Sequence, residues 1–501
     1  ETRESPAMAG AASSGPASMK EWPSGSLLSD EHFVLSLLRW LPLPWGLADI
    51  AVVCRSWSAC SQGHSEFWAQ LTPMPKQLPA IYQVLGSAGR RLRRLDLSGI
   101  GAGAGDIQGH RLAEALARCP NIEVLNLAGC RALKLGDAAG LGATFSQSLR
   151  SLNIRGCDDL QQLLPVWLGP ALQYLEAGWL SEFDDSRDWE AWARVFPRRL
   201  FHTICKKCPN LTVLRVPGYT LLARGMAASD YTAAMVDYRG ISEVGNLARL
   251  RRLDLCCAMP VGDEAICRIA RGCTRLRSIN LRCCGELTDR ALLAIAQHLQ
   301  SVLVHINISC CEFSDGAVRS LASSCRGLKT LDLCYCQRLG PGFIRFLCGD
   351  PAICPRLRML GAGGLEVGDD EVEGICRKYH ATLVHLGIGS ARRLTDAGLA
   401  SLTRLPKLRK LSAHQLSGVS ARGLIELCKG SASLICVDAE GCVLQPPCKP
   451  EHPDNVRLEA CLAEKKYSYE DSDSETDVEK EHGRHEPLSG WAHLPEAIQM
   501  L

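Results

Sequence analysis

The chain has 501 residues, of which 46% are hydrophobic and 22% charged, and its formal net charge at pH 7 is +2. This is the composition of a folded chain long enough to bury more than one hydrophobic core. The near-neutral charge gives no electrostatic reason to expect nucleic acid or an anionic membrane as a partner. No uninterrupted apolar run reaches the ~20 residues of a membrane-spanning helix. We therefore expect neither nucleic acid nor a membrane as a partner.

Residues 1–26 are expected to form a disordered leader, because Ala, Ser, Gly and Pro dominate positions 5–18. The sequence shows no signal peptide. Its 26 cysteines would suggest disulfides in a small secreted protein, but a chain of this size without such a signal favours reduced thiols. We therefore expect a cytoplasmic and/or nuclear location.

Residues 27–71 combine two short apolar helices with a proline break between them. The first helix starts after Asp30 and ends at "LPLP", since proline cannot continue the hydrogen-bond ladder of a helix. A second helix runs from Gly46 to Cys54, with apolar residues at spacings of three and four. "CRSW" follows this helix, and Phe67-Trp68 ends the segment.

This order of features resembles an F-box over about 45 residues, with Ser29 standing where that family usually has proline. The resemblance implies a small three-helix domain that docks onto the Skp-type adaptor of a cullin–RING ubiquitin ligase. A helical cap for the repeats that follow is the alternative, because solenoids need capped ends. The adaptor contacts implied are Leu28, Phe33, Leu37, Leu41, Pro42, Leu47, Ile50, Val53, Cys54 and Trp57.

After an expected linker at 72–91, the motif apolar-x-x-apolar-x-apolar recurs thirteen times over residues 92–445. Ten of the twelve spacings lie between 23 and 30 residues, which is the period of a strand–helix repeat. The motifs begin at Leu92, Ile122, Leu149, Leu172, Leu211, Leu250, Leu276, Leu303, Leu328, Leu357, Leu383, Leu408 and Leu434.

Six of these motifs carry a cysteine three residues after the last apolar position, and several then show a Ser/Thr-Asp pair typical of a helix start. The pattern resembles the cysteine-containing leucine-rich-repeat family. It implies an α/β fold, a right-handed solenoid shaped like a horseshoe and preceded by the F-box domain. The cysteines are expected to point into the core as small apolar groups. They are Cys130, Cys157, Cys284, Cys311, Cys336 and Cys442.

A metal site is not expected. "HTICKKC" places His202, Cys205 and Cys208 at a ligand-like spacing, but a structural zinc site needs four ligands and the sequence offers no fourth. The pair Cys334 and Cys336 is likewise interpreted as structural, and not as part of a metal site. Phosphate-binding, metalloprotease and hydrolase motifs are absent from the sequence, so we expect no enzyme activity and no cofactor.

Two insertions, near 178–207 and 220–246, lengthen their repeats to 39 residues. The first is aromatic and acidic, and its Trp189 and Trp192 are candidates for partner binding because insertions emerge on one face. The alternative is that these side chains pack an enlarged helix against its neighbours.

A second candidate surface comes from glycines in the repeats that start at Leu357 and Leu383. Glycine in a strand often marks a close approach by a partner, so we predict a shallow trough flanked by donors for acidic or phosphorylated side chains. The alternative is that these positions are merely unconstrained. The residues of this expected trough are Gly361, Gly363, His385, Gly387, Gly389, Lys410 and His414.

Residues 446–501 are expected to form an acidic, largely disordered tail. Ser468, Ser472, Ser474 and Thr476 each have an acidic residue three positions later, a pattern that acidophilic kinases favour. An F-box followed by leucine-rich repeats implies a substrate-recognition subunit of an SCF-type ubiquitin ligase, with the adaptor, a cullin and a protein substrate as partners. A repeat scaffold without a role in ubiquitination is the alternative.

Overall fold

The computed structural model describes residues 70–71, 81–98, 109–130, 139–157, 163–178, 199–218, 240–258, 261–439 and 442, and all structural statements refer to these residues. The expected leader, the expected F-box up to residue 69 and the expected acidic tail lie outside them. No helix in the described ranges is long and apolar enough to cross a membrane.

The described residues contain one open parallel sheet of fourteen short strands, in which each strand pairs only with its neighbours in sequence order. Thirteen of these strands lie on the thirteen apolar motifs, so the predicted repeat register is confirmed. The strands are Gln70–Leu71 (β1), Arg94–Asp96 (β2), Val124–Asn126 (β3), Ser151–Asn153 (β4), Tyr174–Glu176 (β5), Val213–Arg215 (β6), Arg252–Asp254 (β7), Ser278–Asn280 (β8), His305–Asn307 (β9), Thr330–Asp332 (β10), Met359–Gly361 (β11), His385–Gly387 (β12), Lys410–Ser412 (β13) and Cys436–Asp438 (β14).

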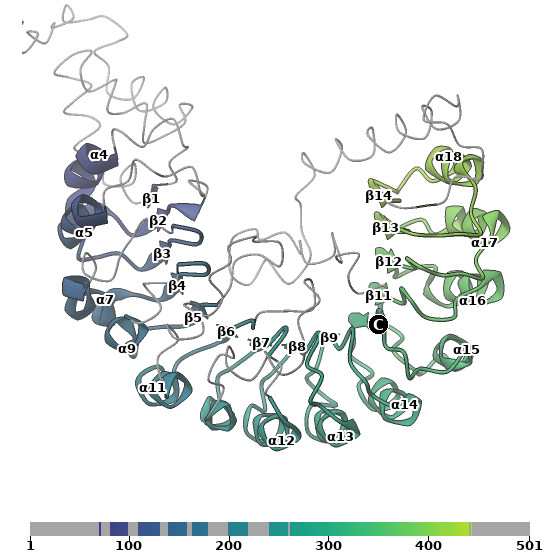
Figure 1. Ribbon diagram of the computed structural model, residues 1–501, viewed down its shortest axis with the longest axis horizontal. Coiled ribbons are helices and arrows are strands. Elements are labelled where there is room, and N and C mark those ends of the chain that lie inside the picture. Colours follow the sequence, from purple (N-terminus) through teal and green to yellow (C-terminus); the bar gives the residue numbers. More distant parts are fainter. Residues whose placement is uncertain are drawn as a thin grey trace, which may run out of the picture.

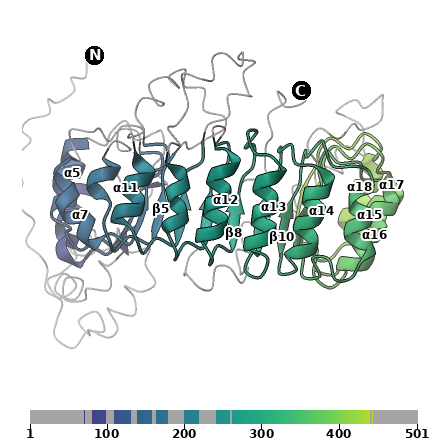
Figure 2. The same cartoon turned by 90° about the horizontal axis from the view of Figure 1, so that it is seen from below.

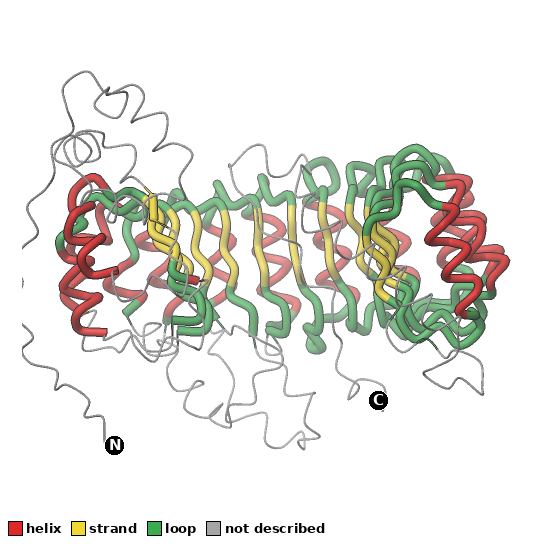
Figure 3. The backbone as a smooth tube through the Cα atoms, turned by 90° about the horizontal axis from the view of Figure 1, so that it is seen from above, coloured by secondary structure: helices red, strands yellow, loops and turns green. Residues whose placement is uncertain are grey.

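Helices connect successive strands and lie on the outside of an arc, with the sheet along its inner side (Figure 1). Seen edge-on, the helices stand side by side in one row (Figure 2), and the strands run parallel to them in a second layer (Figure 3). They are Ile81–Ala88 (α4), Gly109–Ala117 (α5), Gly142–Ser148 (α7), Leu164–Trp167 (α9), Leu200–Lys207 (α11), Asp263–Gly272 (α12), Asp289–His298 (α13), Asp315–Ser324 (α14), Phe343–Gly349 (α15), Asp369–Tyr379 (α16), Asp396–Ser401 (α17) and Ala421–Gly430 (α18), with 3₁₀ turns Gly89–Arg91 (η4), Ala139–Leu141 (η6), Ile241–Asn246 (η9) and Leu402–Arg404 (η10).

The solenoid begins earlier than the apolar motifs predicted. β1 pairs with β2, and α4 lies within the expected linker at 72–91. Leu71, Ile81 and Leu85 are fully buried in the same core as the later repeats. This first unit lacks a complete apolar motif, which is why periodicity alone did not reveal it.

Each repeat buries its motif leucines between the sheet and the helix layer. In the repeat containing β7, Leu250, Leu253 and Leu255 are at most 1% exposed, and the equivalent positions of the other repeats join them in one core. A single strand–helix unit leaves its apolar face open on both sides, so burial is completed only by stacking on neighbours. The helix layer is wider than the strand layer, which bends the stack and gives the sheet its concave face (Figure 1).

The predicted inward cysteines are a structural ladder. Five of the six are at most 2% exposed, and Cys442 is half-buried. Each thiol donates to the carbonyl of the last apolar residue in the preceding repeat, for example Cys311 Sγ to Leu281 O at 3.1 Å and Cys336 Sγ to Ile308 O at 3.1 Å. A small apolar side chain with a weak donor therefore serves each repeat junction, which leucine or alanine could not do.

A second ladder joins the helix starts. It confirms the caps predicted from the Ser/Thr-Asp pairs at Thr288, Ser314 and Thr395, and adds Ser420. Thr288, Ser314, Thr395 and Ser420 each accept a hydrogen bond from a backbone N–H in the first turn of their helix. The aspartate at the start of the preceding helix accepts both the N–H and the hydroxyl of that cap residue. In one example, Asp369 binds Thr395 N at 2.9 Å and Thr395 Oγ1 at 2.6 Å.

Candidate protein-binding surface

The concave face of the sheet carries the polar side chains of the repeats. In half of the strands, for example β3, β7 and β9, the middle residue is buried and the two flanking residues are partly exposed, because successive side chains of a strand point to opposite faces. In six others, β4, β5 and β10–β13, the third residue is buried as well. The third strand residues form one row across the sheet, from Asp96 in β2 to Asp438 in β14. We call this the third-position row.

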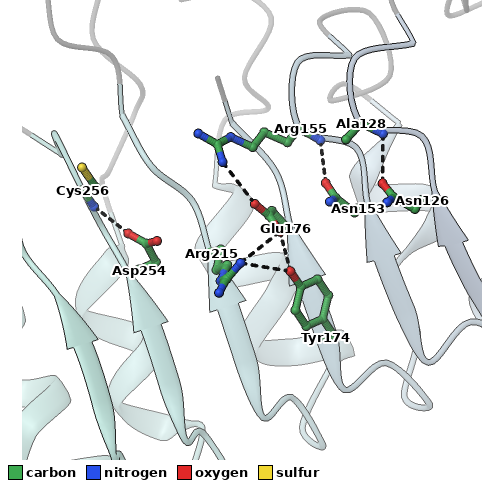
Figure 4. Close-up of polar contacts among 9 residues, drawn as sticks. All are labelled: Asn126, Ala128, Asn153, Arg155, Tyr174, Glu176, Arg215, Asp254 and Cys256. Atoms are coloured by element: carbon green, nitrogen blue, oxygen red, sulfur yellow. Dashed lines mark hydrogen bonds and ion pairs between the residues drawn. The ribbon is translucent and has the colours of Figure 1, made fainter. Parts of the chain in front are cut away.

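Most polar members of the third-position row shape the backbone. In seven strands an Asn or Asp accepts, through Oδ1, the backbone N–H two residues later, at 2.9–3.1 Å (Figure 4 shows three of them). This contact ends the strand and starts the turn, as Asx turns do. The residues are Asp96, Asn126, Asn153, Asp254, Asn280, Asn307 and Asp332.

In most of the described repeats, the turn that follows the strand places one residue in the left-handed region. Glycine occupies this position early in the solenoid, as at Gly129 and Gly156, but three successive repeats place cysteine there, at φ values of 59°, 56° and 57°. Cys257 N, Cys283 N and Cys310 N each donate to a carbonyl of the next repeat, at 2.7–2.9 Å. The position is thus held by the lateral stacking of repeats, and a side chain is tolerated there despite its backbone cost.

A buried charged cluster replaces the Asx turns at β5 and β6. Glu176 is only 3% exposed, and it accepts a hydrogen bond from the hydroxyl of Tyr174. Arg155 and Arg215 approach its two carboxylate oxygens at 3.6 and 3.5 Å, and Arg215 also lies 3.5 Å from the Tyr174 hydroxyl (Figure 4). Two guanidinium groups around one buried carboxylate compensate its desolvation.

Sequence reasoning did not single out this cluster. The sequence feature that could have pointed to the cluster is that Glu176 and Arg215 stand where most repeats have Asn or Asp in the third-position row. Asp254 lies next to them, and burial raises the pKa of its carboxyl above the ordinary value. Burial likewise raises the pKa of Asp332 to about 6.

The expected glycine trough differs in shape from the prediction. Gly361 pairs with Gly387 in neighbouring strands, and all four glycines are buried. A Cβ at Gly389 would lie 2.3 Å from Cε1 of His414, so the imidazole covers this glycine and the floor is not open there. A leucine at Gly389 would therefore have to displace the His414 ring.

The His414 ring belongs to a polar cluster that the sequence did not reveal. Its Nε2 lies 3.2 Å from the hydroxyl of Tyr335, and that hydroxyl lies 3.0 Å from Ser390 Oγ. Ser390 also donates to Gln415 Oε1 at 3.1 Å. The left-handed position of Tyr335 directs its ring over Gly364, where a Cβ would lie only 2.6 Å from the ring. The glycines therefore make room for Tyr335 and His414.

His385 and Lys410 lie side by side, because their strands pair at these two residues. Burial, together with the positive charges of Lys410 and Arg409, lowers the pKa of His385 to about 4. His385 is therefore neutral across pH 5–8, and the positive charge at this place comes from Lys410.

The ligand-like residues of "HTICKKC" do not assemble into a metal site. His202 Nδ1 lies 2.8 Å from Glu243 Oε2 at the surface, and Cys208 is fully buried at the end of α11. Burial raises the pKa of Cys205 and of Cys208 to about 12, so both thiols stay protonated. Over the described part of the chain, no group of three His, Cys, Asp or Glu side chains is arranged to hold a metal ion.

Two sets of expected site residues lie outside the described residues: Trp189 and Trp192 of the first insertion, and the adaptor contacts from Leu28 to Trp57. They remain predictions from the sequence.

Comparison with known proteins supports the repeat assignment. The family described as "Leucine Rich repeat" matches residues 272–296, which cover the end of α12, the strand β8 and most of α13. A leucine-rich repeat is present.

No curated protein matches the chain. Among solved structures, the crystal structure of the Rad7 and Elc1 complex in yeast is similar, with 14% sequence identity, coverage of 76% of this chain and 87% of that chain, and a TM-score of 0.39. At this level of similarity no partner or activity transfers from that complex.

Proposed function

We propose that this leucine-rich-repeat protein is the substrate-recognition subunit of an SCF-type ubiquitin ligase. The observation that carries the proposal is the order of two modules: the F-box pattern at 27–71 immediately precedes a solenoid whose concave sheet is lined with charged and polar side chains. The F-box would dock the Skp-type adaptor and, through it, a cullin. The concave sheet would hold the protein to be ubiquitinated.

The described part of the concave face suits a binding role. Most of its polar side chains sit on short, regularly spaced strands that are fixed by the buried leucines beneath them, and rigid presentation favours specific recognition. Lys410 beside His385 offers a cation for an acidic or phosphorylated side chain of the substrate. The Tyr335–Ser390–His414 cluster adds hydrogen-bonding groups one turn away.

Affinity purification of the full chain from cells, followed by detection of the Skp-type adaptor and a cullin, tests the proposal. Co-purification of both is the expected result. A repeat scaffold without a role in ubiquitination is the alternative function, and recovery of neither protein from cells that contain both would favour it.

A further inference from the structure

Three free thiols lie in a line across the turns that follow β7, β8 and β9. Cys257, Cys283 and Cys310 each stand three residues after the end of their strand, and we call them the thiol row. Cys257 N donates to Arg282 O at 2.7 Å, which aligns this turn with that of Cys283. Cys283 N donates to Ser309 O at 2.9 Å and is aligned with Cys310 in the same way. Successive repeats therefore place one thiol beside the next.

The spacing within the thiol row suits a disulfide. Paired strands lie about 4.8 Å apart, and a disulfide needs Cα atoms about 4.4–6.8 Å apart. The three residues share one left-handed backbone conformation, with φ values of 59°, 56° and 57°, so their side chains leave the turns in the same direction. The thiols of Cys257 and Cys310 both hydrogen-bond to that of Cys283. Bond formation between neighbours therefore requires no large movement of the backbone.

The middle thiol of the row favours the ionised form. Hydrogen bonds from the thiols of Cys257 and Cys310 lower the pKa of Cys283 against the opposing effect of its burial. The guanidinium of Arg282 acts in the same direction as these hydrogen bonds. The same contacts raise the pKa of the two flanking thiols, which therefore stay protonated. Since the thiolate is the nucleophilic form of cysteine, Cys283 is the nucleophile of the row.

The cysteine that follows in two of these turns has a different role. Cys284 is fully buried and donates to Leu255 O at 3.2 Å. Cys311 is 1% exposed and donates to Leu281 O at 3.1 Å. Burial raises the pKa of both thiols above the ordinary value, so neither has the thiolate character that oxidation requires. Cys284 and Cys311 are therefore matched controls for the thiol row.

We propose that Cys283 is a site of reversible oxidation by hydrogen peroxide, with Cys310 as its resolving thiol. Cys283 is 4% exposed, so a small oxidant is the class of reagent that suits it. Cys310 is partly exposed, whereas Cys257 is 4% exposed and its sulfur also lies 3.4 Å from that of Cys256. A nucleophilic thiol beside a resolving thiol is the arrangement of redox-sensitive cysteines.

The reaction proceeds in two balanced steps. The Cys283 thiolate attacks one oxygen of the peroxide, the O–O bond breaks, and the leaving hydroxide takes up a proton to become water. The sulfur is thereby oxidised to a sulfenic acid. Cys310 Sγ then attacks the Cys283 sulfur, the S–O bond breaks, and the hydroxyl leaves with the thiol proton as a second water. Two thiols and one peroxide thus give one disulfide and two waters, and a thiol reductant reverses the change.

The disulfide joins the repeats of β8 and β9 at the turns where these strands end. Oxidation therefore adds a covalent tie between two repeats that otherwise stack without one. The thiol row does not suit a metal ion, because within the described ranges no group of three His, Cys, Asp or Glu side chains has a metal-binding arrangement. The inference rests on the thiol row and does not depend on an adaptor or on ubiquitination.

Mass spectrometry of the oxidised full chain tests the link. The reduced protein is treated with equimolar hydrogen peroxide, its remaining thiols are alkylated, and it is digested with trypsin. Cleavage after arginine places the two cysteine pairs on separate peptides, 283–290 and 291–319. These peptides should be recovered as one disulfide-linked species that dithiothreitol separates. Absence of the linked species would overturn the proposal.

Matched serine variants identify which thiol of each pair reacts. Cys283→Ser should abolish the linked species, whereas Cys284→Ser and Cys311→Ser should leave it unchanged, since serine keeps a donor for the carbonyl at these two positions. Urea unfolding of each reduced variant checks that it is folded. Cys348 is a partly exposed thiol whose pKa burial raises to about 11, and it should stay reduced in every sample. Equal losses in the three variants, or oxidation of Cys348 to the same extent as Cys283, would refute the proposal.

A trapping experiment tests the order of the two steps. In the double variant Cys257→Ser with Cys310→Ser, hydroxyls replace both flanking thiols and can still donate to Cys283, but neither can form a disulfide. After peroxide treatment, dimedone should label Cys283 about ten-fold more in this variant than in the wild type, because the sulfenic acid is no longer consumed. Equal labelling of the two chains would show that the flanking thiols do not resolve an oxidised Cys283, contrary to the proposal.

Discussion

At the scale of single residues, the third-position row shows that Asn and Asp can make the same contact at different energetic cost. Asn and Asp alternate there with the same Oδ1 contact to the turn, so the hydrogen bond requires an oxygen and no charge. Burying an ionised Asp at this position costs the desolvation free energy of its charge, whereas burying the neutral Asn does not. The raised pKa of Asp332, about 6, expresses that difference.

Asp332→Asn is therefore expected to stabilise the protein at pH 8 by about 2–3 kcal/mol, the free energy equivalent of a shift of roughly two pKa units. The native carboxyl holds its proton more tightly than the unfolded one. Its contribution is full below the unfolded pKa near 4 and is lost as the pH rises through about 6. Urea unfolding at pH 5 and pH 8 measures this, and the gain at pH 5 should be about half of the gain at pH 8, because the unfolded carboxyl is already ionised at pH 5.

The reverse change, Asn307→Asp, is the control for the same row. It should destabilise the protein at pH 8 and about half as much at pH 5. A gain for Asp332→Asn that is equal at both pH values would contradict the explanation by burial of a charge.

Adjacent cysteines in this solenoid differ in what their positions require, a backbone conformation at Cys310 and a buried side chain at Cys311. Cys310 is in the left-handed region at φ 57°, whereas Cys311 is buried and donates to Leu281 O at 3.1 Å. Cys310→Gly should change the free energy of unfolding by less than about 1 kcal/mol, because relief of backbone strain offsets the flexibility of glycine. Cys311→Gly should cost about 2–3 kcal/mol through the cavity and the lost hydrogen bond. Equal losses in chemical denaturation would contradict the assignment of roles.

At the scale of elements, helix caps act between repeats as well as within them. An aspartate in the first turn of one helix holds the cap residue of the next helix through two hydrogen bonds, so neighbouring helix starts are tied together. This explains why the Ser/Thr-Asp pair recurs: the hydroxyl caps its own helix, and the carboxylate reaches forward to the next.

Two neighbouring aspartates in the first turn of α16 separate this effect from the general benefit of negative charge at a helix start. Asp369 holds Thr395, whereas Asp370 is exposed. Asp369→Ala should destabilise the protein by about 1–3 kcal/mol, because it leaves two donors without their acceptor. Asp370→Ala should cost under about 0.5 kcal/mol, which thermal or urea unfolding would measure. Similar losses for both would assign the whole effect to the helix dipole.

At the scale of the whole molecule, each strand pairs only with its neighbours in sequence order, although the side chains of Tyr335 and His414 meet across repeats that are not adjacent. The sheet β1–β14 buries its own core of repeat leucines, and the adaptor contacts implied by the sequence, from Leu28 to Trp57, lie outside the described residues. Docking to an adaptor and capture of a partner are accordingly expected to be separable by substitution.

Combined alanine substitution of Leu41, Pro42 and Trp57 should abolish co-purification of the Skp-type adaptor, because these residues carry the F-box pattern. Unfolding of the solenoid should be unchanged. If the triple variant still binds the adaptor fully, residues 27–71 form only a cap.

The substitution Lys410→Glu should weaken capture of an acidic partner and leave adaptor binding intact, as measured by quantitative pull-down.

The sequence alone determined the repeat register, the inward cysteines and the helix caps, because each of these depends on contacts repeated at a fixed spacing along the chain. Periodicity predicts such features, as thirteen strands on thirteen motifs demonstrate. It missed β1 and α4, whose unit lacks the full motif and is defined by packing against β2 and α5.

Only the tertiary structure decided which polar residues of the concave face share a neighbourhood. Glu176 meets Arg155 and Arg215 across three strands, and His414 covers Gly389 while reaching Tyr335, 79 residues away in the chain. Side-chain direction and rotamer fix these contacts, and neither follows from the period of the repeat.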